Sequence, residues 1–162
     1  MLLDPAATPN PASALRVLVV DDNEINREVL NGLLSHWGID VQEACVGKQA
    51  VELVCANDCT YDIVLMDVMM PVMDGVTATG LIRRFERALG ISETLPVVAY
   101  TAGDLNDDPG TLARTGFSAV LRKPTSPDRL RRCLQRWCAQ KMDSMDFFGT
   151  TGFAELDALT AG

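Results

Sequence analysis

Residues 63–75 read IVLMDVMMPVMDG. Four apolar residues, Ile63 to Met66, are followed by a carboxylate, Asp67, and the apolar run then resumes. A short continuous apolar run is typical of a strand buried on both faces of a parallel sheet. An acid directly after such a strand lies where the strand leaves the core. We therefore expect Asp67 at the rim of the core, where a ligand can reach it.

The same alternation of apolar strands and helical segments extends along most of the chain. Strands are expected at residues 15–22, 41–45, 61–67, 95–101 and 119–123, and helices at residues 24–37, 47–57, 75–89, 104–115 and 127–141. The helix at 104–115 is expected to be short or bent, because Pro109-Gly110 falls in its middle. This alternation predicts an α/β fold, a doubly wound five-stranded parallel sheet with helices on both faces.

The first predicted helix shows the clearest apolar spacing. Its large apolar residues recur every four positions: Ile25, Val29, Leu33 and Trp37. Such spacing is typical of an amphipathic helix, so this face is expected to turn toward the core. Asp22 or Asn23 can cap the start of the helix, and Gly38 ends it.

Composition and charge exclude several classes of function. The net charge is −8, from 22 acids and 14 bases, whereas binding to nucleic acid or to an acidic membrane needs a basic surface. No apolar run approaches the ~20 residues of a membrane span, and the first residues do not read as a secretory signal. The five cysteines are odd in number and form no C-x-x-C pair, which favours reduced thiols. We expect a cytoplasmic protein that binds neither nucleic acid nor membrane.

Three segments are expected along the chain. Residues 1–14 are rich in proline, alanine and asparagine, which predicts a disordered N-terminal segment. Residues 15–141 form the single domain. Residues 142–162 are acidic and contain several large apolar side chains. Two interpretations of this last segment stay open: a disordered tail or linker, or a segment that docks on a partner or packs back on the domain.

Polar side chains follow the apolar strands at their carboxyl ends: Asp21 and Asp22, Asp67, Thr101 and Lys123. Ligands of such sheets bind beyond these ends, so the five side chains are expected in one pocket. Clustered carboxylates repel one another unless a cation is present, and Mg²⁺ prefers a few carboxylates with waters and a phosphate oxygen. A lysine and a hydroxyl suit phosphoryl oxygens, and a remaining carboxylate can form an aspartyl phosphate.

Four motifs at these strand ends resemble the response-regulator receiver domain of two-component signalling. They are VVDDNEINR (19–27), IVLMDVMMPVMDG (63–75), AYTA (99–102) and RKP (122–124), in the order of the family. The first two are especially similar to receivers attached to, or partnered with, hybrid histidine kinases. The resemblance covers nearly the whole predicted domain and implies a flavodoxin-like sheet with strand order 2-1-3-4-5.

The resemblance implies a role for each residue at the strand ends. Asp67 is the phosphoacceptor, Thr101 is the switch hydroxyl, and Lys123 pairs with the phosphoryl group. Mg²⁺ is implied to bind Asp21, Asp22, Asp67 and Met69. In this set Met69 contributes its backbone carbonyl, and Asp21 acts directly or through water. By the same resemblance, a cis peptide precedes Pro124.

The implied function is that of a phosphoacceptor in a phosphorelay that controls protein–protein interaction. A histidine kinase or a histidine phosphotransfer protein supplies the phosphoryl group, and Asp67 accepts it with Mg²⁺. The domain catalyses its own phosphorylation and slow dephosphorylation, and is a signalling domain rather than a turnover enzyme. A true phosphohydrolase often uses a D-x-D pair, which Met69 disfavours here.

Two departures from the family favour a different output. Val120 occupies the position three before Lys123, where the family usually has a tyrosine or phenylalanine that rotates with the threonine. The predicted fourth helix is interrupted by Pro109-Gly110. The alternative function is therefore a receiver-fold binding scaffold whose output is largely independent of phosphorylation.

A third departure concerns the lifetime of the phosphorylated state. Met69 stands two residues after Asp67, and Gly103 stands two residues after Thr101. Polar side chains at these positions can orient the water that hydrolyses the acyl phosphate, and methionine and glycine cannot. The sequence therefore predicts slow self-dephosphorylation.

Overall fold

The computed structural model describes residues 14–56 and 60–144. In these ranges strands and helices alternate in the predicted order. The strands are β1 (Arg16–Val20), β2 (Asp40–Ala44), β3 (Ile63–Met66), β4 (Val97–Thr101) and β5 (Ala119–Arg122). The helices are α1 (Glu24–His36), α2 (Gly47–Cys55), α3 (Gly75–Ala88), α4 (Pro109–Thr115) and α5 (Pro127–Ser144). Residues 1–13 and 145–162, which include most of the two predicted terminal segments, lie outside the described residues.

All five strands are parallel and lie in the order β2-β1-β3-β4-β5, as predicted. In the central pairs Val17 aligns with Ile63, and Val64 aligns with Val97. Every residue of β3 and of β4 is buried, which explains their continuous apolar sequence. Because the strands are parallel, their carboxyl ends meet at one edge of the sheet.

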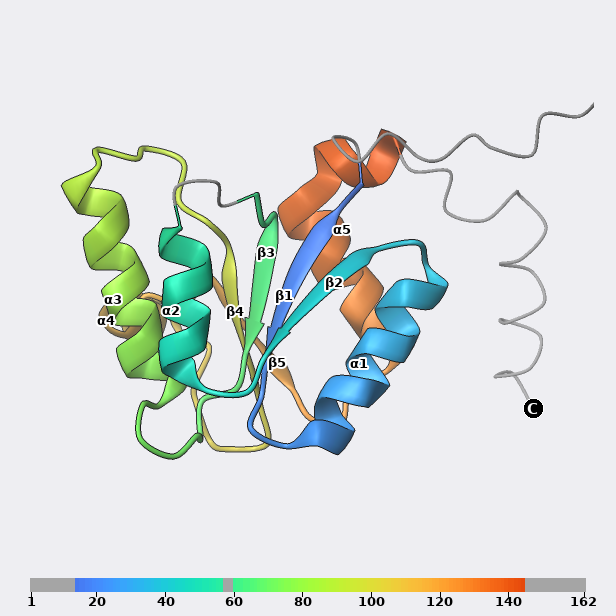
Figure 1. Cartoon of the computed structure of the whole chain (residues 1–162), viewed down its shortest axis with the longest axis horizontal. Coiled ribbons are helices and arrows are strands. Elements are labelled where there is room, and N and C mark those ends of the chain that lie inside the picture. Colours follow the sequence, from blue (N-terminus) through green and yellow to red (C-terminus); the bar gives the residue numbers. More distant parts are fainter. Residues whose placement is uncertain (1–13, 57–59, 145–162) are drawn as a thin grey trace, which may run out of the picture.

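Helices cover both faces of the sheet (Figure 1). On one face, buried leucines of α1 and α5 pack on the sheet: Leu30, Leu34, Leu130 and Leu134. On the other face, small and branched residues of α2 and α3 do so: Ala50, Val54, Ala78 and Ile82. Leu112 of α4 packs against this second cluster. The doubly wound architecture is therefore confirmed.

Only half of the residues predicted to face the core from α1 do so. Leu33 and Trp37 are partly buried, but Ile25 is 68% exposed and Val29 is 62% exposed. The buried residues are Leu30 and Leu34. A four-residue step exceeds the 3.6-residue turn by about 40°, so the first members of the series rotate away from the sheet. The start of α1 thus exposes two large apolar side chains beside the carboxyl edge.

The last two helices differ from their predicted bounds. Pro109 begins α4 rather than interrupting it, because proline lacks only an N–H that the first turn does not use. The Asp108 side chain caps this seven-residue helix by accepting from the Thr111 N–H at 3.1 Å. Helix α5 continues past Lys141 to Ser144, with a bend at Cys138, and Met142 is buried in the core.

Candidate functional site

Three acids meet at the carboxyl edge of the sheet. Asp21 follows β1 and is 1% exposed, Asp67 follows β3 and is 6% exposed, and Asp22 is exposed. Each offers a carboxylate oxygen to a group whose members lie within 4.8 Å of one another. The backbone N–H of Asp67 donates to the carbonyl of Val20 at 2.8 Å, which ties the third strand end to the first. The structure brings together the acids that the sequence singled out.

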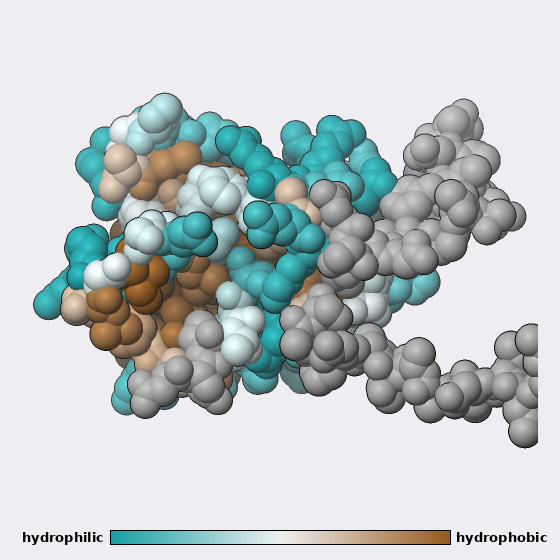
Figure 2. All heavy atoms as spheres, turned by 90° about the horizontal axis from the view of Figure 1, so that it is seen from above, coloured by the Kyte–Doolittle hydropathy of each residue, from teal (hydrophilic) through white to brown (hydrophobic). Residues whose placement is uncertain are grey.

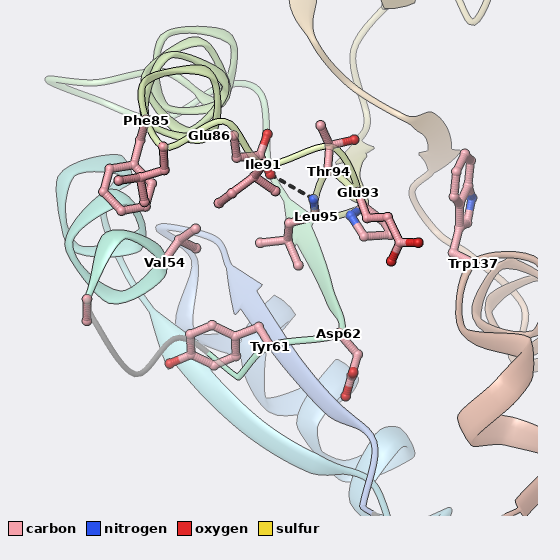
Figure 3. Close-up of a pocket in the computed structure, with 13 residues that line it drawn as sticks. Val54, Tyr61, Asp62, Phe85, Glu86, Ile91, Glu93, Thr94, Leu95 and Trp137 are labelled. Atoms are coloured by element: carbon pink, nitrogen blue, oxygen red, sulfur yellow. Dashed lines mark hydrogen bonds between the residues drawn. The ribbon is translucent and has the colours of Figure 1, made fainter.

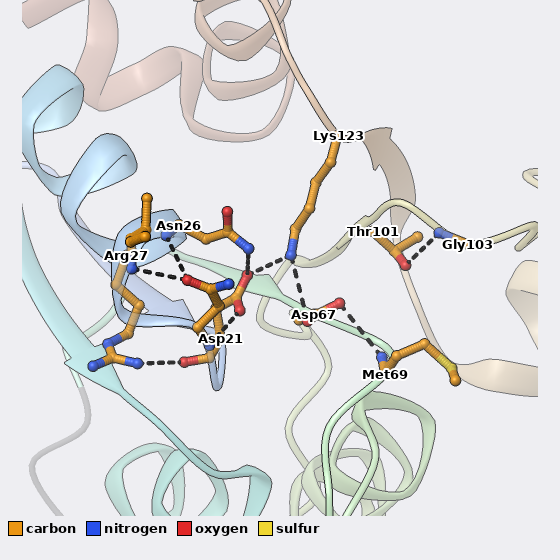
Figure 4. A network of polar contacts seen from close by, with 10 residues as sticks. Asp21, Asn26, Arg27, Asp67, Met69, Thr101, Gly103 and Lys123 are labelled. Atoms are coloured by element: carbon orange, nitrogen blue, oxygen red, sulfur yellow. Dashed lines mark hydrogen bonds and ion pairs between the residues drawn. The ribbon is translucent and has the colours of Figure 1, made fainter.

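Lys123 reaches this cluster from the end of β5 (Figure 4). Its ammonium forms a short ion pair with Asp21 and lies 3.4 Å from Asp67. Burial disfavours the charged ammonium, but its hydrogen bond to Asp21 and the charges of both acids outweigh this effect and raise the pKa of Lys123. The Nζ atom also lies 5.2 Å from the ring centroid of Tyr100, which is buried. Lys123 is therefore held as a cation between the two buried acids.

Asp67 has the opposite electrostatic character. Burial raises the pKa of its carboxyl, Lys123 opposes this effect, and the charge of Asp21 adds to it. The net direction is upward, so the ionised carboxylate is less stable here than in water. Three acids face one lysine, and the cluster carries excess negative charge that a cation would neutralise.

Residues at the start of α1 hold Asp21 in place. The Asn23 N–H donates to Asp21 Oδ1 at 2.9 Å, and Asn26 Nδ2 donates to Oδ2 at 3.3 Å. The Arg27 guanidinium donates to the Asp21 backbone carbonyl at 2.8 Å, and its Nε lies 3.5 Å from Glu43. Asn26 and Arg27 were not singled out from the sequence, although both belong to the motif at 19–27.

The loop after Asp67 is shaped by close backbone approach. A Cβ on Gly75 would lie 2.1 Å from the Asp67 carbonyl oxygen, so only glycine fits there. Val72 adopts a positive φ of 68°, inside a tight turn closed by the Met73 N–H and the Pro71 carbonyl at 2.8 Å. The sequence indicated a tight turn at Gly75, whereas the left-handed residue of the loop is Val72.

Met69 contributes to the site through its backbone. Its N–H lies 3.4 Å from Asp67 Oδ1. Its side chain is 73% exposed and points away from Asp67 (Figure 4). The methionine side chain therefore does not cover the carboxylate.

Thr101 ends β4 on the same edge and is buried. Its hydroxyl oxygen accepts from the Gly103 N–H at 3.1 Å (Figure 4). Arg122 donates to the carbonyls of Gly103 and Leu105 at 3.0 and 3.1 Å, so β5 holds the segment that follows Thr101. Val120 is half-buried and packs against the α2–α3 side of the core. The Lys123–Pro124 peptide is cis, as the resemblance implied.

The donor set fits a hard divalent cation. Three carboxylates within reach of one another supply oxygen ligands and excess negative charge, and the exposed Asp22 leaves one side open to water. Mg²⁺ characteristically binds through one or two carboxylates and keeps several waters. No nitrogen or sulfur ligand belongs to this group, so the residues suit Mg²⁺ better than a transition metal.

Comparison with known families agrees with this geometry. The model of the response regulator receiver domain matches residues 17–135. The chain belongs to this family. The matched range includes all four motifs and every residue of the acidic cluster.

The receiver is similar to several curated and solved proteins. It is 38% identical over 122 residues to the two-component system protein A of Emericella nidulans, covering 75% of this chain and 17% of that relative. The chain thus spans less than a fifth of the length of such relatives.

Two solved structures are informative. A sensor histidine kinase receiver domain from Pseudomonas aeruginosa, described with a magnesium ion in its active-site cleft, is 35% identical, with a TM-score of 0.64, covering 76% of this chain and 97% of that one. The Ssk1 receiver domain of Saccharomyces cerevisiae, solved with the phosphotransfer protein Ypd1, is 29% identical, with a TM-score of 0.69. That match covers 79% of this chain and 92% of the other.

The opposite, amino end of the sheet has a different character. A hollow of about 550 Å³ lies there between α2, α3, the segment before β4, and Trp137 of α5 (Figure 3). Figure 2 views the molecule from this end and shows hydrophobic residues exposed in its left half. The acids that line the hollow are ion-paired or exposed: Asp62 pairs with Lys141 at 2.9 Å, and Glu86 pairs with Arg83 at 2.8 Å, whereas Glu93 is exposed.

Arg83 and Glu86 form the most connected polar group of this end. The Arg83 guanidinium also donates to the carbonyls of Leu95 and Gly116 at 2.8 and 2.9 Å, and Glu86 accepts from the Leu95 N–H at 2.7 Å. These contacts join α3 to the segments that precede β4 and β5.

Across the described ranges, no helix is long and apolar enough to cross a membrane.

Proposed function

We propose that this receiver accepts a phosphoryl group on Asp67 from a phosphohistidine, in a reaction that depends on Mg²⁺. One observation carries the proposal: the Asp67 carboxylate lies between two further acids and a lysine, at the carboxyl edge of a receiver sheet. The raised pKa of Asp67 leaves a carboxylate that is poorly stabilised by its surroundings and is free to act as a nucleophile.

The transfer balances without a further reactant. An Asp67 oxygen attacks the phosphorus, the phosphorus–nitrogen bond of the phosphohistidine breaks, and its electron pair stays on the imidazole, which takes up a proton from solvent. The product is an acyl phosphate on Asp67. Charge on the phosphoryl oxygens grows during the transfer, so positive and N–H groups around the acceptor accelerate it.

The chain supplies such groups from three strand ends. The Lys123 ammonium, 3.4 Å from Asp67, is placed to pair with one phosphoryl oxygen. The Met69 N–H, 3.4 Å from Asp67 Oδ1, can donate to another. The Thr101 hydroxyl, which accepts from Gly103, has a proton of its own to donate to a third.

Asp21, Asp22, Asp67 and the Met69 carbonyl are the residues that we propose as Mg²⁺ ligands. When bound, the ion neutralises the acids and polarises the phosphoryl group. Asn23, Asn26 and Arg27 hold Asp21 in position for this role.

The test is phosphorylation of the purified chain by a small phosphodonor. Incubation with Mg²⁺ and phosphoramidate or acetyl phosphate is expected to add one phosphoryl group by intact mass, and the group is expected to be absent in Asp67→Asn. Equal labelling of the variant would place the acceptor elsewhere. No labelling of the natural chain would refute the proposal.

The phosphorylated state is proposed to be long-lived. Gly103 has no side chain to orient a water, and the Met69 side chain is apolar and exposed. The lifetime of the phosphorylated chain in Mg²⁺ is expected to shorten about tenfold or more in Met69→Glu, since a positioned general base contributes about 10²–10⁴-fold. A lifetime of seconds for the phosphorylated natural chain, measured by intact mass, would contradict the proposed long-lived state.

A histidine phosphotransfer protein or histidine kinase is the proposed partner. The exposed apolar side chains Ile25 and Val29 lie on the first turns of α1, and Met69 and Val72 lie on the loop after Asp67. Both segments follow strands at the carboxyl edge. Large exposed apolar residues grouped beside an acceptor suit a partner that must bring its histidine close. The Ssk1 receiver, solved with Ypd1, supports this class of partner.

A second candidate function is a binding scaffold whose output is largely independent of phosphorylation. It is favoured by Val120, which offers no aromatic ring to rotate with Thr101, and by the seven-residue α4. Equal partner affinity of the phosphorylated and unphosphorylated chains would support it. Docking of residues 142–162 on a partner, and a cytoplasmic location, are also proposals.

A further inference from the structure

Helix α5 carries a basic stripe on a chain that is acidic overall. Five of the 14 bases of the chain lie in this helix. The stripe consists of the exposed arginines Arg129, Arg132 and Arg136. At 3.6 residues per turn they fall within about 60° of arc, opposite the buried Leu130 and Leu134. The stripe therefore faces away from the sheet.

The positive charge of the stripe is only partly neutralised by its surroundings. Asp128 accepts from Arg132 at 2.5 Å and from Arg131 at 2.6 Å. The Arg136 guanidinium lies 5.5 Å from the Trp137 ring centroid, and no carboxylate pairs with it among the side chains of residues 14–56 and 60–142. In the same ranges the Arg129 guanidinium has neither a hydrogen bond nor an ion pair. Asp128 is thus shared between two arginines of this helix.

The segment that follows α5 has the complementary composition. Residues 145–162 contain Asp146, Glu155 and Asp157 and no lysine or arginine. They also contain six large apolar residues: Met145, Phe147, Phe148, Phe153, Leu156 and Leu159. We propose that residues 145–162 dock on the basic stripe of α5, with Glu155 and Asp157 paired to its arginines.

The geometry allows this contact. At 1.5 Å per helical residue, Arg136 lies about 12 Å and Arg129 about 22 Å before Ser144 along α5. Glu155 is eleven residues beyond Ser144, and an extended chain of that length spans up to about 36 Å. Either acid can therefore reach any arginine of the stripe if the segment turns back.

Exposed ion pairs are individually weak and are screened by salt. Covalent connection compensates, because it presents the acids to the stripe at an effective concentration in the millimolar range. The docked state is therefore expected to be reversible and sensitive to salt. While it persists, the stripe is closed to any other acidic partner.

The test uses backbone order parameters of the full chain measured by NMR relaxation. At about 0.01 M ionic strength, residues 153–157 are expected to approach the rigid value of about 0.85, and at about 1 M to fall below about 0.6. Arg129→Glu with Arg136→Glu is expected to lower them at low salt as well. The matched control, Arg84→Glu with Arg87→Glu, changes two exposed arginines of α3 and is expected to leave them unchanged.

A charge swap makes the test specific. Adding Glu155→Arg and Asp157→Arg to the Arg129→Glu, Arg136→Glu chain is expected to restore order. Order parameters below about 0.6 in the natural chain at low salt would overturn the proposal. The proposal would also be overturned if residues 153–157 stay ordered at high salt and lose this order in Leu89→Asp, because the segment would then cover the apolar hollow. Order that disappears on dilution would assign the contact to a second copy. The outcome does not depend on phosphorylation of Asp67.

Discussion

Both ends of the sheet hold buried or partly buried acids, but the two ends balance the charge of their acids differently. At the amino end, Asp62 has Lys141 and the Arg16 N–H, and Glu86 has Arg83 and the Leu95 N–H. At the carboxyl end, the three acids share one lysine, Lys123. A buried acid that has its own cation is compensated, whereas an excess of one sign leaves a place for a ligand of the other sign. This difference separates the candidate site from an ordinary buried ion pair.

The largest expected effect tests this distinction directly. Asp67→Asn is expected to abolish phosphorylation by a small phosphodonor, whereas Asp62→Asn, at the other end, is expected to leave it unchanged. Both changes remove one charge from a largely buried acid that lies near a lysine. Intact mass after incubation with Mg²⁺ measures the outcome. Loss of labelling in both variants would mean that charge balance does not distinguish the ends.

The second effect concerns stability. Arg83→Ala leaves the buried Glu86 without its cation and is expected to lower the free energy of unfolding by about 3 kcal/mol, as measured by urea unfolding. Mg²⁺ is not expected to restore it, because the pair lies at the far end from the acidic cluster. Arg84→Ala, which truncates the exposed neighbour, is expected to change it by less than about 0.5 kcal/mol. Similar losses in both variants would refute a special role for the pair.

The exposed apolar residues of the two ends provide a third comparison. Ile25→Asp is expected to weaken binding to a cognate phosphotransfer protein by about 2 kcal/mol, roughly 30-fold, while labelling by a small phosphodonor is unchanged. Leu89→Asp is the control, because Leu89 is 61% exposed beside the hollow. Surface plasmon resonance measures both. Equal loss of affinity in the two variants would indicate that the partner does not bind selectively at the carboxyl end.

The smallest effect follows from the raised pKa of Asp67. A carboxyl whose pKa is higher in the folded state contributes stability below its unfolded pKa, and loses it as pH rises through the folded value. In EDTA, the stability gained by Asp67→Asn over the natural chain is therefore expected to grow as pH rises from 4 to 7. Adding Mg²⁺ is expected to reduce this gain. A gain that is constant with pH would contradict the upward shift.

Most of the architecture could be predicted from the sequence, because the apolar pattern of each strand or helix indicates which of its faces are buried. The continuous apolar runs of β3 and β4 indicate burial on both sides, and polar residues after them indicate the strand ends. Asp21, Asp67 and Lys123 were placed in one pocket by this reasoning alone. Their individual roles remain proposals.

Features that depend on distant neighbours could not be predicted in this way. The exposure of Ile25 and Val29 depends on the exact rotation of α1 over the sheet, which the apolar spacing did not define. The Arg83–Glu86 pair has ordinary helical spacing, and only its burial makes it important. The bonds of Asn26 and Arg27 to Asp21 depend on how α1 leaves β1.

The contact between Lys123 and Asp21 joins residues 102 positions apart, and this has a consequence for protein synthesis. At about 5–20 residues per second, Lys123 is added roughly 5–20 s after Asp21. Asp67 is added part-way through that interval, and from then on the growing chain contains the acids of the cluster but lacks the lysine and the last strand. The proposed acceptor site is therefore complete only when β5 has been synthesised and has joined the sheet.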